Sequence, residues 1–226
     1  IYDSELLRNE ANCQPLTPIT FLERAAAVFP EHVAIIYGDR SICYADFFSR
    51  CRKLASVLAD RGIGRGDTVS VMLANTPAML EAHYAVPMCG AVLHSLNTRL
   101  DAGVIAFQLE HAESKVLITD TAFSKTVRAA LEITKAQPWL IDYVDPVCSQ
   151  TGERLSDYDY ESLVGSGDVD FNWLMPLDEW DAISLNYTSG TTGNPKGVVY
   201  HHRGAYLLAL GNILAWNLGM HPRYLW

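Results

Sequence analysis

The residues best suited to chemistry lie together in one eleven-residue segment, Tyr187–Gly197, with the sequence YTSGTTGNPKG. It contains three glycines, three threonines, one serine and one lysine, and it follows an apolar run. Glycines let backbone N–H groups approach an anion closely, and the hydroxyl groups add further donors. Lys196 adds a mobile positive charge. This combination predicts a site for a polyphosphate chain accompanied by Mg²⁺.

Two familiar phosphate-binding patterns do not fit this segment. In a P-loop the lysine follows the last glycine and a helix begins there. Here Lys196 precedes Gly197, and the residues that follow have the composition of a strand. The segment also lacks the G-x-G-x-x-G spacing of dinucleotide-binding loops. The remaining alternative is an ordinary hairpin loop, which the density of anion-binding residue types disfavours.

The other residues that could bind a ligand are not grouped in this way. Neighbouring side chains on a strand point to opposite faces, so His201 and His202 are not expected to chelate one metal ion. We expect them to cap or pack the start of the following helix. No Cys/His cluster in the sequence has zinc-ligand spacing. Structural roles are also expected for the isolated histidines and for three tryptophans: His83, His94, His111, Trp173, Trp180 and Trp216.

The composition favours a folded globular protein. Of the 226 residues, 49% are hydrophobic and 19% are charged, a balance that excludes a disordered or collagen-like chain. The formal net charge of -9 disfavours a nucleic-acid partner, because phosphates must be met by clustered Lys and Arg. The five scattered cysteines, together with the lack of a visible signal peptide, predict reduced thiols in a cytoplasmic protein. No run reaches the roughly 18 apolar residues of a membrane span.

Short apolar runs alternate with helical patterns along the chain. The predicted strands are Val33–Tyr37, Ser41–Tyr44, Thr68–Leu73, Ala91–Leu96, Lys115–Asp120, Trp139–Val144, Ala182–Tyr187 and Gly197–Tyr200. The predicted helices are Ala25–Phe29 with a capping box at Thr20 and Glu23, Asp46 to Gly62, Met79–Met88 after Pro77, Asp101–His111, Phe123–Glu132 and Gly204–Leu218. The pair Gly38-Asp39 predicts a turn between the first two strands, which would make them a hairpin.

This rhythm predicts an α/β fold of layered, mostly parallel sheets with helices on both faces. Residues 145–180 break the rhythm with a sequence rich in Ser, Gly, Asp and Tyr, and we expect a surface excursion there, with one helical turn at Glu161–Val164. Residues 1–18 are polar and contain two prolines, which predicts an N-terminal arm. Residues 19–226 are then expected to belong to one large domain.

The phosphate segment resembles the signature of the adenylate-forming superfamily, which includes acyl-CoA synthetases, firefly-type luciferases and peptide-synthetase adenylation domains. That signature is a Ser/Thr-rich start, then Gly, Thr-Thr-Gly, any residue and Pro-Lys-Gly, and this sequence matches it throughout. Further similar segments extend from about Thr20 to Trp226: Phe21–Ala25, Tyr44–Phe47, Gly62–Val69, Gly90–Leu100 and His202–Gly204. The variant Asn97–Leu100 is similar to that of acyl-CoA ligases for short and medium acids, above all plant-type acyl-activating enzymes and methylmercaptopropionate ligases.

The resemblance implies an ATP-dependent, AMP-forming acyl-CoA synthetase that uses Mg²⁺ and coenzyme A. It implies that the Thr188 hydroxyl binds Mg²⁺ and that Lys196 is a catalytic residue that accompanies pyrophosphate. It assigns the β- and γ-phosphates to the residues between them: Ser189, Gly190, Thr191, Thr192 and Gly193. The implied partners are a small carboxylic acid, ATP and coenzyme A, and a homodimer is left open.

Two alternatives share the phosphate segment. One is another adenylate-forming enzyme that loads a carrier protein or works as a luciferase does, and the other is a homologue that binds a nucleotide without catalysis. The resemblance places the adenine-stacking residue, the acidic Mg²⁺ ligand, most of the acyl pocket and a C-terminal lysine beyond the 226 residues. We therefore expect these residues alone to be inactive.

Overall fold

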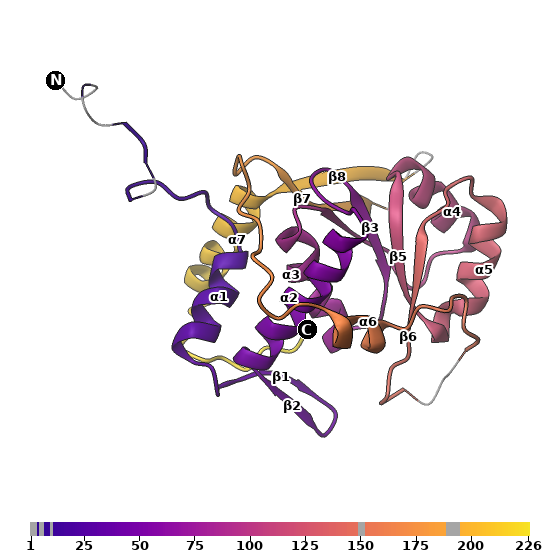
Figure 1. Cartoon of the computed structure of the whole chain (residues 1–226), viewed down its shortest axis with the longest axis horizontal. Helices are drawn as coiled ribbons and strands as arrows, with labels where there is room; N and C mark the ends of the chain where they lie inside the picture. Colours follow the sequence, from indigo (N-terminus) through magenta and orange to yellow (C-terminus); the bar gives the residue numbers. More distant parts are fainter. Residues whose placement is uncertain (1–3, 5–6, 10, 149–151, 189–194) are drawn as a thin grey trace.

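A six-stranded sheet forms the centre of the protein (Figure 1). The structure is a computed structural model that describes residues 4, 7–9, 11–148, 152–188 and 195–226. In spatial order the strands are β6 (Trp139–Tyr143), β5 (Ser114–Asp120), β3 (Thr68–Met72), β4 (Val92–Ser95), β7 (Ala182–Thr188) and β8 (Lys196–His201). The first five run parallel and β8 is antiparallel to β7. The prediction of a mostly parallel sheet is confirmed.

Helices cover both faces of the sheet, as predicted. One face packs against α2 (Tyr44–Asp60) and α3 (Pro77–Met88), with α1 (Ile19–Val28) and the short α6 (Tyr160–Ser166) beside them. The other face packs against α4 (Ala102–His111) and α5 (Ser124–Ile133), the latter preceded by a 3-10 turn, Thr121–Phe123. In β5, Val116 and Ile118 join the first cluster while Leu117 joins the second. This explains why the strand is apolar on both faces.

The predicted hairpin forms outside the six-stranded sheet and lies at the bottom of Figure 1. Strands β1 (Val33–Tyr37) and β2 (Arg40–Cys43) pair antiparallel, and Gly38 at the turn has φ of +58°, a conformation that favours glycine.

The predicted capping box at the start of α1 is wrong. The helix begins at Ile19, and Thr20 Oγ1 donates back to the Thr17 carbonyl oxygen at 2.8 Å. Glu23 instead accepts a hydrogen bond from Trp173 Nε1 at 3.1 Å. A tertiary contact explains the difference. The Glu23 carboxylate, which would have capped the helix, instead bonds Trp173 in the segment that connects β6 to β7.

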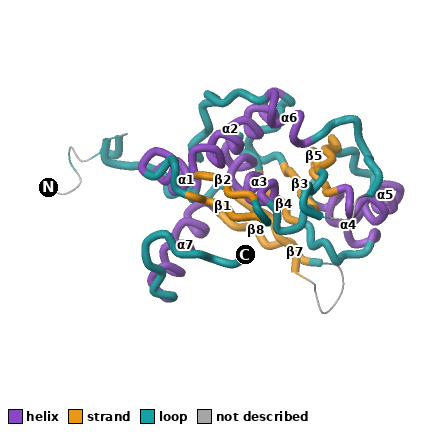
Figure 2. The backbone as a smooth tube through the Cα atoms, turned by 90° about the horizontal axis from the view of Figure 1, so that it is seen from below, coloured by secondary structure: helices purple, strands orange, loops and turns teal. Residues whose placement is uncertain are grey.

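That segment, residues 144–181, connects β6 at one edge of the sheet to β7 beyond β4. It passes over the helices on one face (Figures 1 and 2), where Leu174 N donates to the Met88 carbonyl oxygen at 2.8 Å. Within it, α6 is held to α2 and α3 by charge. Arg50 bonds Glu81 at 2.6 Å and Glu161 at 2.8 Å, and Tyr160 Oη donates to Glu81 at 2.7 Å. In residues 152–181, the predicted surface excursion is therefore a strap that is bonded to the helices beneath it.

The last helix, α7 (His202–Ala215), stands apart from this core. Its only buried residue is His202, and its contact with α1 includes stacked rings of Phe21 and Tyr206 with centroids 4.4 Å apart. Residues Leu16 and Thr17 of the predicted arm lie against its first turn: Leu16 N donates to Glu179, which pairs with Arg203.

Candidate functional site

Thr188 and Lys196 flank the predicted phosphate segment and lie directly opposite each other. Thr188 is the last residue of β7, Lys196 is the first of β8, and the two are register partners. Both are exposed. They lie at the edge where the parallel strands end, which is where open α/β sheets bind their ligands. The predicted cradle residues Ser189, Gly190, Thr191, Thr192 and Gly193 lie outside the described residues.

Gly197 allows the two strands to approach at this point. A Cβ atom at this position would lie 3.0 Å from Leu185 Cδ1 and 3.6 Å from Tyr187 Cε1. The glycine of the Pro-Lys-Gly sequence therefore makes room for two β7 side chains. Tyr187 is the register partner of Gly197, so its ring lies over that glycine on one face of the sheet, and the adjacent Thr188 and Lys196 side chains point to the other face.

Tyr187 is held from the side by α4. Its hydroxyl lies 2.6 Å from His111 Nδ1. Phe107 stacks on the His111 ring at a centroid distance of 5.4 Å and meets the Tyr187 ring edge-on at 6.5 Å. Burial raises the pKa of Tyr187, so the phenol stays protonated. A structural role was expected for His111, but its partner was not predicted, because no local pattern links two residues so far apart in the chain.

A buried polar chain lies beneath Tyr187. His94, whose ring centroid is 5.1 Å from that of Tyr187, bonds Ser70 Oγ at 2.8 Å through Nδ1 and contacts Gln108 at 3.4 Å through Nε2. Ser70 in turn bonds Ser114 at 2.6 Å. Burial lowers the pKa of His94 to about 4, so the ring is neutral at neutral pH. The predicted structural role of His94 is confirmed.

His201 and His202 act separately at the start of α7, as expected. His201 Nδ1 accepts from Gly204 N at 2.8 Å and caps the helix, while His202 Nδ1 lies 2.9 Å from Thr17 Oγ1. Burial lowers the pKa of His202 to about 4. Among the described residues no group of three or more His, Cys, Asp or Glu side chains is arranged to hold a metal ion.

Other polar side chains at the carboxyl edge are used to build turns. Asp120 accepts from Ala122 N at 2.9 Å, and Asp145 accepts from Tyr37 Oη at 2.5 Å. Asn97 accepts from Arg99 N at 2.9 Å. These bonds shape the loops around the strand ends.

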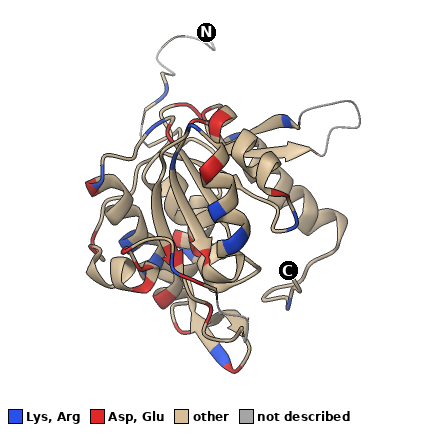
Figure 3. Cartoon of the chain, turned by 90° about the vertical axis from the view of Figure 1, so that its right-hand side faces the viewer, with Lys and Arg blue, Asp and Glu red and all other residues tan. Residues whose placement is uncertain are grey.

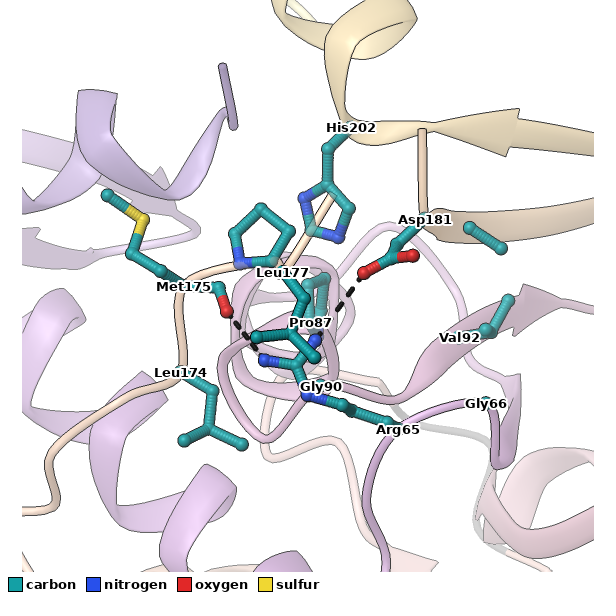
Figure 4. Close-up of a pocket in the computed structure, with 12 residues that line it drawn as sticks. Arg65, Gly66, Pro87, Gly90, Val92, Leu174, Met175, Leu177, Asp181 and His202 are labelled. Carbon is teal, nitrogen blue, oxygen red and sulfur yellow. Dashed lines mark hydrogen bonds and ion pairs between the residues drawn. The ribbon is translucent and has the colours of Figure 1, made fainter. Parts of the chain in front are cut away.

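A cavity of about 210 Å³ lies at the opposite, amino-terminal edge of the sheet (Figure 4). Its lining includes Gly66, Val92 and Ala182, which lie at or near the starts of three strands. The Arg65 guanidinium donates to the Met175 carbonyl oxygen at 2.8 Å and lies 3.4 Å from Asp181. Arg65 thus anchors the crossing strap, and the cavity is distinct from the Thr188–Lys196 edge.

The tryptophans meet the prediction only in part. Trp173 is half-buried and bonded to Glu23, as a packing residue should be. Trp180 and Trp216 are 66% and 55% exposed, with rings against His201 and Tyr224. These two tryptophans therefore pack against single rings at the surface and are not part of the core. All five cysteines are free thiols, as predicted.

The fold and this edge define an open α/β protein with a Gly/Thr/Lys segment at the carboxyl end of a parallel sheet. Residues 22–226 match the model of the family described as AMP-binding enzyme, and the chain belongs to that family. It is 44% identical to a peroxisomal acetate/butyrate–CoA ligase of Arabidopsis thaliana and 42% identical to an acetate–CoA ligase of Humulus lupulus. Each alignment covers 98% of this chain, and the chain spans 41% of the length of each relative.

Solved structures share the fold. An anthranilate CoA ligase in complex with anthranoyl-AMP superposes with a TM-score of 0.77 at 18% identity, over 87% of this chain and 37% of the other. The o-succinylbenzoate CoA synthetase of Bacillus subtilis, in complex with its acyl-adenylate intermediate, gives 0.70 at 26% identity, over 88% and 47%. The sequence resemblance to the adenylate-forming superfamily is confirmed.

The predicted cytoplasmic location is contradicted by these relatives. The acetate/butyrate, butyrate and benzoate CoA ligases of Arabidopsis thaliana are all named as peroxisomal. Reduced thiols argue against an oxidising compartment but do not distinguish one reducing compartment from another. In the described part of the chain, no helix has the length and apolar character needed to cross a bilayer.

Proposed function

We propose that the protein carrying this chain is an AMP-forming acyl-CoA synthetase for short- or medium-chain carboxylic acids. The observation that carries the proposal is the placement of Thr188 and Lys196 as register partners at the carboxyl edge of the parallel sheet. Support for the acid class comes from the relatives, whose names specify acetate, butyrate and benzoate.

In the first half-reaction, a carboxylate oxygen of the acid attacks the α-phosphorus of ATP. The new P–O bond replaces the bond to the leaving pyrophosphate, and the products are an acyl-adenylate and pyrophosphate. Negative charge builds up on the leaving group, so fixed positive charge near it lowers the barrier. Lys196 is exposed at the end of the predicted phosphate segment, where its ammonium group can interact with the charge on pyrophosphate.

Thr188 is the proposed Mg²⁺ ligand on this chain. Its hydroxyl is an exposed oxygen donor at the carboxyl edge, and oxygen is the ligand type that Mg²⁺ selects. When bound, the ion would neutralise phosphate charge. The backbone and hydroxyl groups of Ser189–Gly193 are proposed to hold the β- and γ-phosphates, as the residue types in this segment indicate.

In the second half-reaction, the sulfur of coenzyme A attacks the acyl carbon. The thiol loses its proton, the C–O bond to AMP breaks, and an acyl-CoA thioester forms. Pyrophosphate has left by then, so Lys196 and Thr188 have no phosphate tail to bind in this step.

Acid-dependent exchange of labelled pyrophosphate into ATP tests the first half-reaction, and AMP release that requires coenzyme A tests the second. Both are measured on the intact protein with acids of two to eight carbons, with Lys196→Ala as the control. Exchange without coenzyme-A-dependent AMP release would point to carrier-protein loading or luciferase-like chemistry. ATP binding without exchange would point to the non-catalytic homologue.

A further inference from the structure

The hydrogen bond between Tyr187 and His111 joins the end of β7, next to Thr188, to helix α4, which is packed in the core. Helix α4 is anchored by Ile105 and Leu109, both 0% exposed, in the cluster that it forms with α5 and the sheet. His111 is the last residue of that helix. The helix backbone is therefore fixed relative to the sheet at this point, and the His111 side chain itself is exposed.

The imidazole of His111 is itself held in place. Phe107 lies one turn earlier on the same helix, and its ring stacks on the imidazole with an interplanar angle of 24°. The Tyr187 ring meets both: it is edge-on to Phe107 at 79° and to His111 at 76°. Edge-to-face contacts of this kind fix ring orientation in addition to the hydrogen bond.

Tyr187 transmits this constraint to both strands. It precedes Thr188 in β7, and its ring lies 3.6 Å from the position where a Cβ of Gly197 would be, next to Lys196 in β8. Below it, the neutral His94 closes the space between the sheet and α4. In the described part of the chain, Tyr187 is the neighbour of Thr188 whose side chain is hydrogen-bonded to α4.

We propose that His111 is a positioning residue that acts through Tyr187 to fix Thr188 opposite Lys196 for binding of the ATP polyphosphate. The proposal rests on the proposed function. His111 touches neither the acid nor the reacting phosphorus in this assignment. Its loss should therefore weaken ATP binding and leave recognition of the acid unchanged.

The test uses four single variants and one double variant of the intact protein. Tyr187→Phe and His111→Phe each remove the hydrogen bond, and His111→Gln keeps a polar group at the same place. His83→Phe is the control, because His83 is a histidine in the middle of α3 whose Nδ1 bonds the Met79 carbonyl oxygen of its own helix. The double variant Tyr187→Phe/His111→Phe completes a thermodynamic cycle.

The first measurement does not depend on activity. Amide hydrogen exchange at Thr188 and Lys196 should be about five-fold faster in Tyr187→Phe, in His111→Phe and in the double variant alike, the size expected for one hydrogen bond. His111→Gln and His83→Phe should match the parent protein. The thermal midpoint should change little in all of them. Equal exchange rates in every variant, or additive effects in the double variant, would overturn the proposal.

The second measurement is the KM for ATP in pyrophosphate exchange, which should rise about five-fold in the two bond-removing variants while the KM for the acid stays the same. A rise in both KM values, or a loss of kcat alone, would contradict a positioning role at the phosphates. If the parent protein shows no exchange at all, the proposed function fails, and the hydrogen-exchange result still decides whether His111 holds the strand ends.

Discussion

Two regions of the sheet differ sharply in how they are covered. The closed region, β3–β6 with α2–α5, buries most of its strand residues: Val69, Val71 and Ile118 are all 0% exposed. The open region, β8 with α7, has similarly apolar residues but leaves Val199 62% and Leu214 81% exposed. In Figure 3, α7 is drawn almost without charge, and Arg203 is its only charged residue.

This difference in burial suggests that the closed region determines stability and that the border with the open region carries the proposed chemistry. The closed region holds the rigid frame, and the predicted phosphate-binding residues lie at its border with the open region. A helix that is apolar on all sides is typical of a position inside a protein. The exposed face of β8 and α7 is therefore more apolar than a surface helix and strand usually are. Changes in the open region should alter rates, whereas changes in the closed region should alter folding.

The largest effect should come from Lys196→Ala. We expect the rate of acid-dependent pyrophosphate exchange to fall by about 10²–10³-fold, because one contact to a developing charge is lost. The urea midpoint should stay unchanged, since Lys196 is exposed. Thioester formation from synthetic acyl-adenylate and coenzyme A should remain nearly intact.

Thr188→Ala is the companion variant. Raised Mg²⁺ should partly restore exchange in Thr188→Ala and should have no such effect on Lys196→Ala. An equal loss in both half-reactions would show that the segment acts in folding or domain closure, and it would remove the proposed separation between the two regions.

Leu54→Ala should destabilise the protein by about 3 kcal/mol, because it leaves a cavity in the closed region where Leu54 is 0% exposed. The matched change Leu214→Ala, at a position 81% exposed in the open region, should stay within about 0.5 kcal/mol. Urea unfolding measures both. Similar losses would mean that α7 is packed in solution and that the comparison is wrong.

Acidification should weaken the closed region through His94. Its folded pKa is about 4, below the ordinary 6.5, so the unfolded chain binds the proton more tightly. Stability is full above pH 6.5 and is lost as the pH falls towards the folded pKa. We expect a loss on the order of 2 kcal/mol by about pH 5, measured by urea unfolding.

Two variants distinguish the regions in this experiment. His94→Gln should flatten the global pH dependence. His202→Gln should chiefly change local exchange at the start of α7, because His202 holds Thr17 and little else of the core. A global curve that responds to His202→Gln as strongly as to His94→Gln would contradict the distinction.

The smallest effect concerns the exposed apolar face. The 226-residue chain should bind the dye ANS, and the double change Leu208→Lys/Leu214→Lys should reduce the fluorescence with little effect on unfolding, since both side chains are more than half exposed. Unchanged ANS fluorescence in the double variant would show that the dye binds at a site other than the exposed face of α7.

Much of the frame could be predicted from local sequence. The β-branched run at Thr68–Met72 and the periodic pattern of α2 both report burial directly, and Gly38 specifies its turn through a positive φ. The prediction that this segment binds an anion likewise rests on its residue types.

What could not be predicted depends on contacts between distant segments. Nothing in the local sequence around His111 or Tyr187 predicts that the two residues form a hydrogen bond. Glu23 has the spacing of a capping residue, but it bonds Trp173 instead. The exposure of α7 was equally hidden, because an apolar helix has the same pattern whether or not a neighbour covers it.

The strap of residues 144–181 also sets the order in which the chain can fold. Strands β3 to β6 pair with near neighbours in sequence, so they can assemble early during synthesis. Leu93 must then find Ser184, roughly ninety residues later, before β7 can dock, and closing so long a loop is entropically slow. The two strands that present Thr188 and Lys196 are thus added last, to a template that already exists. In this order of folding, β3–β6 form first, and Thr188 and Lys196 come together only after the strap has connected β6 to β7.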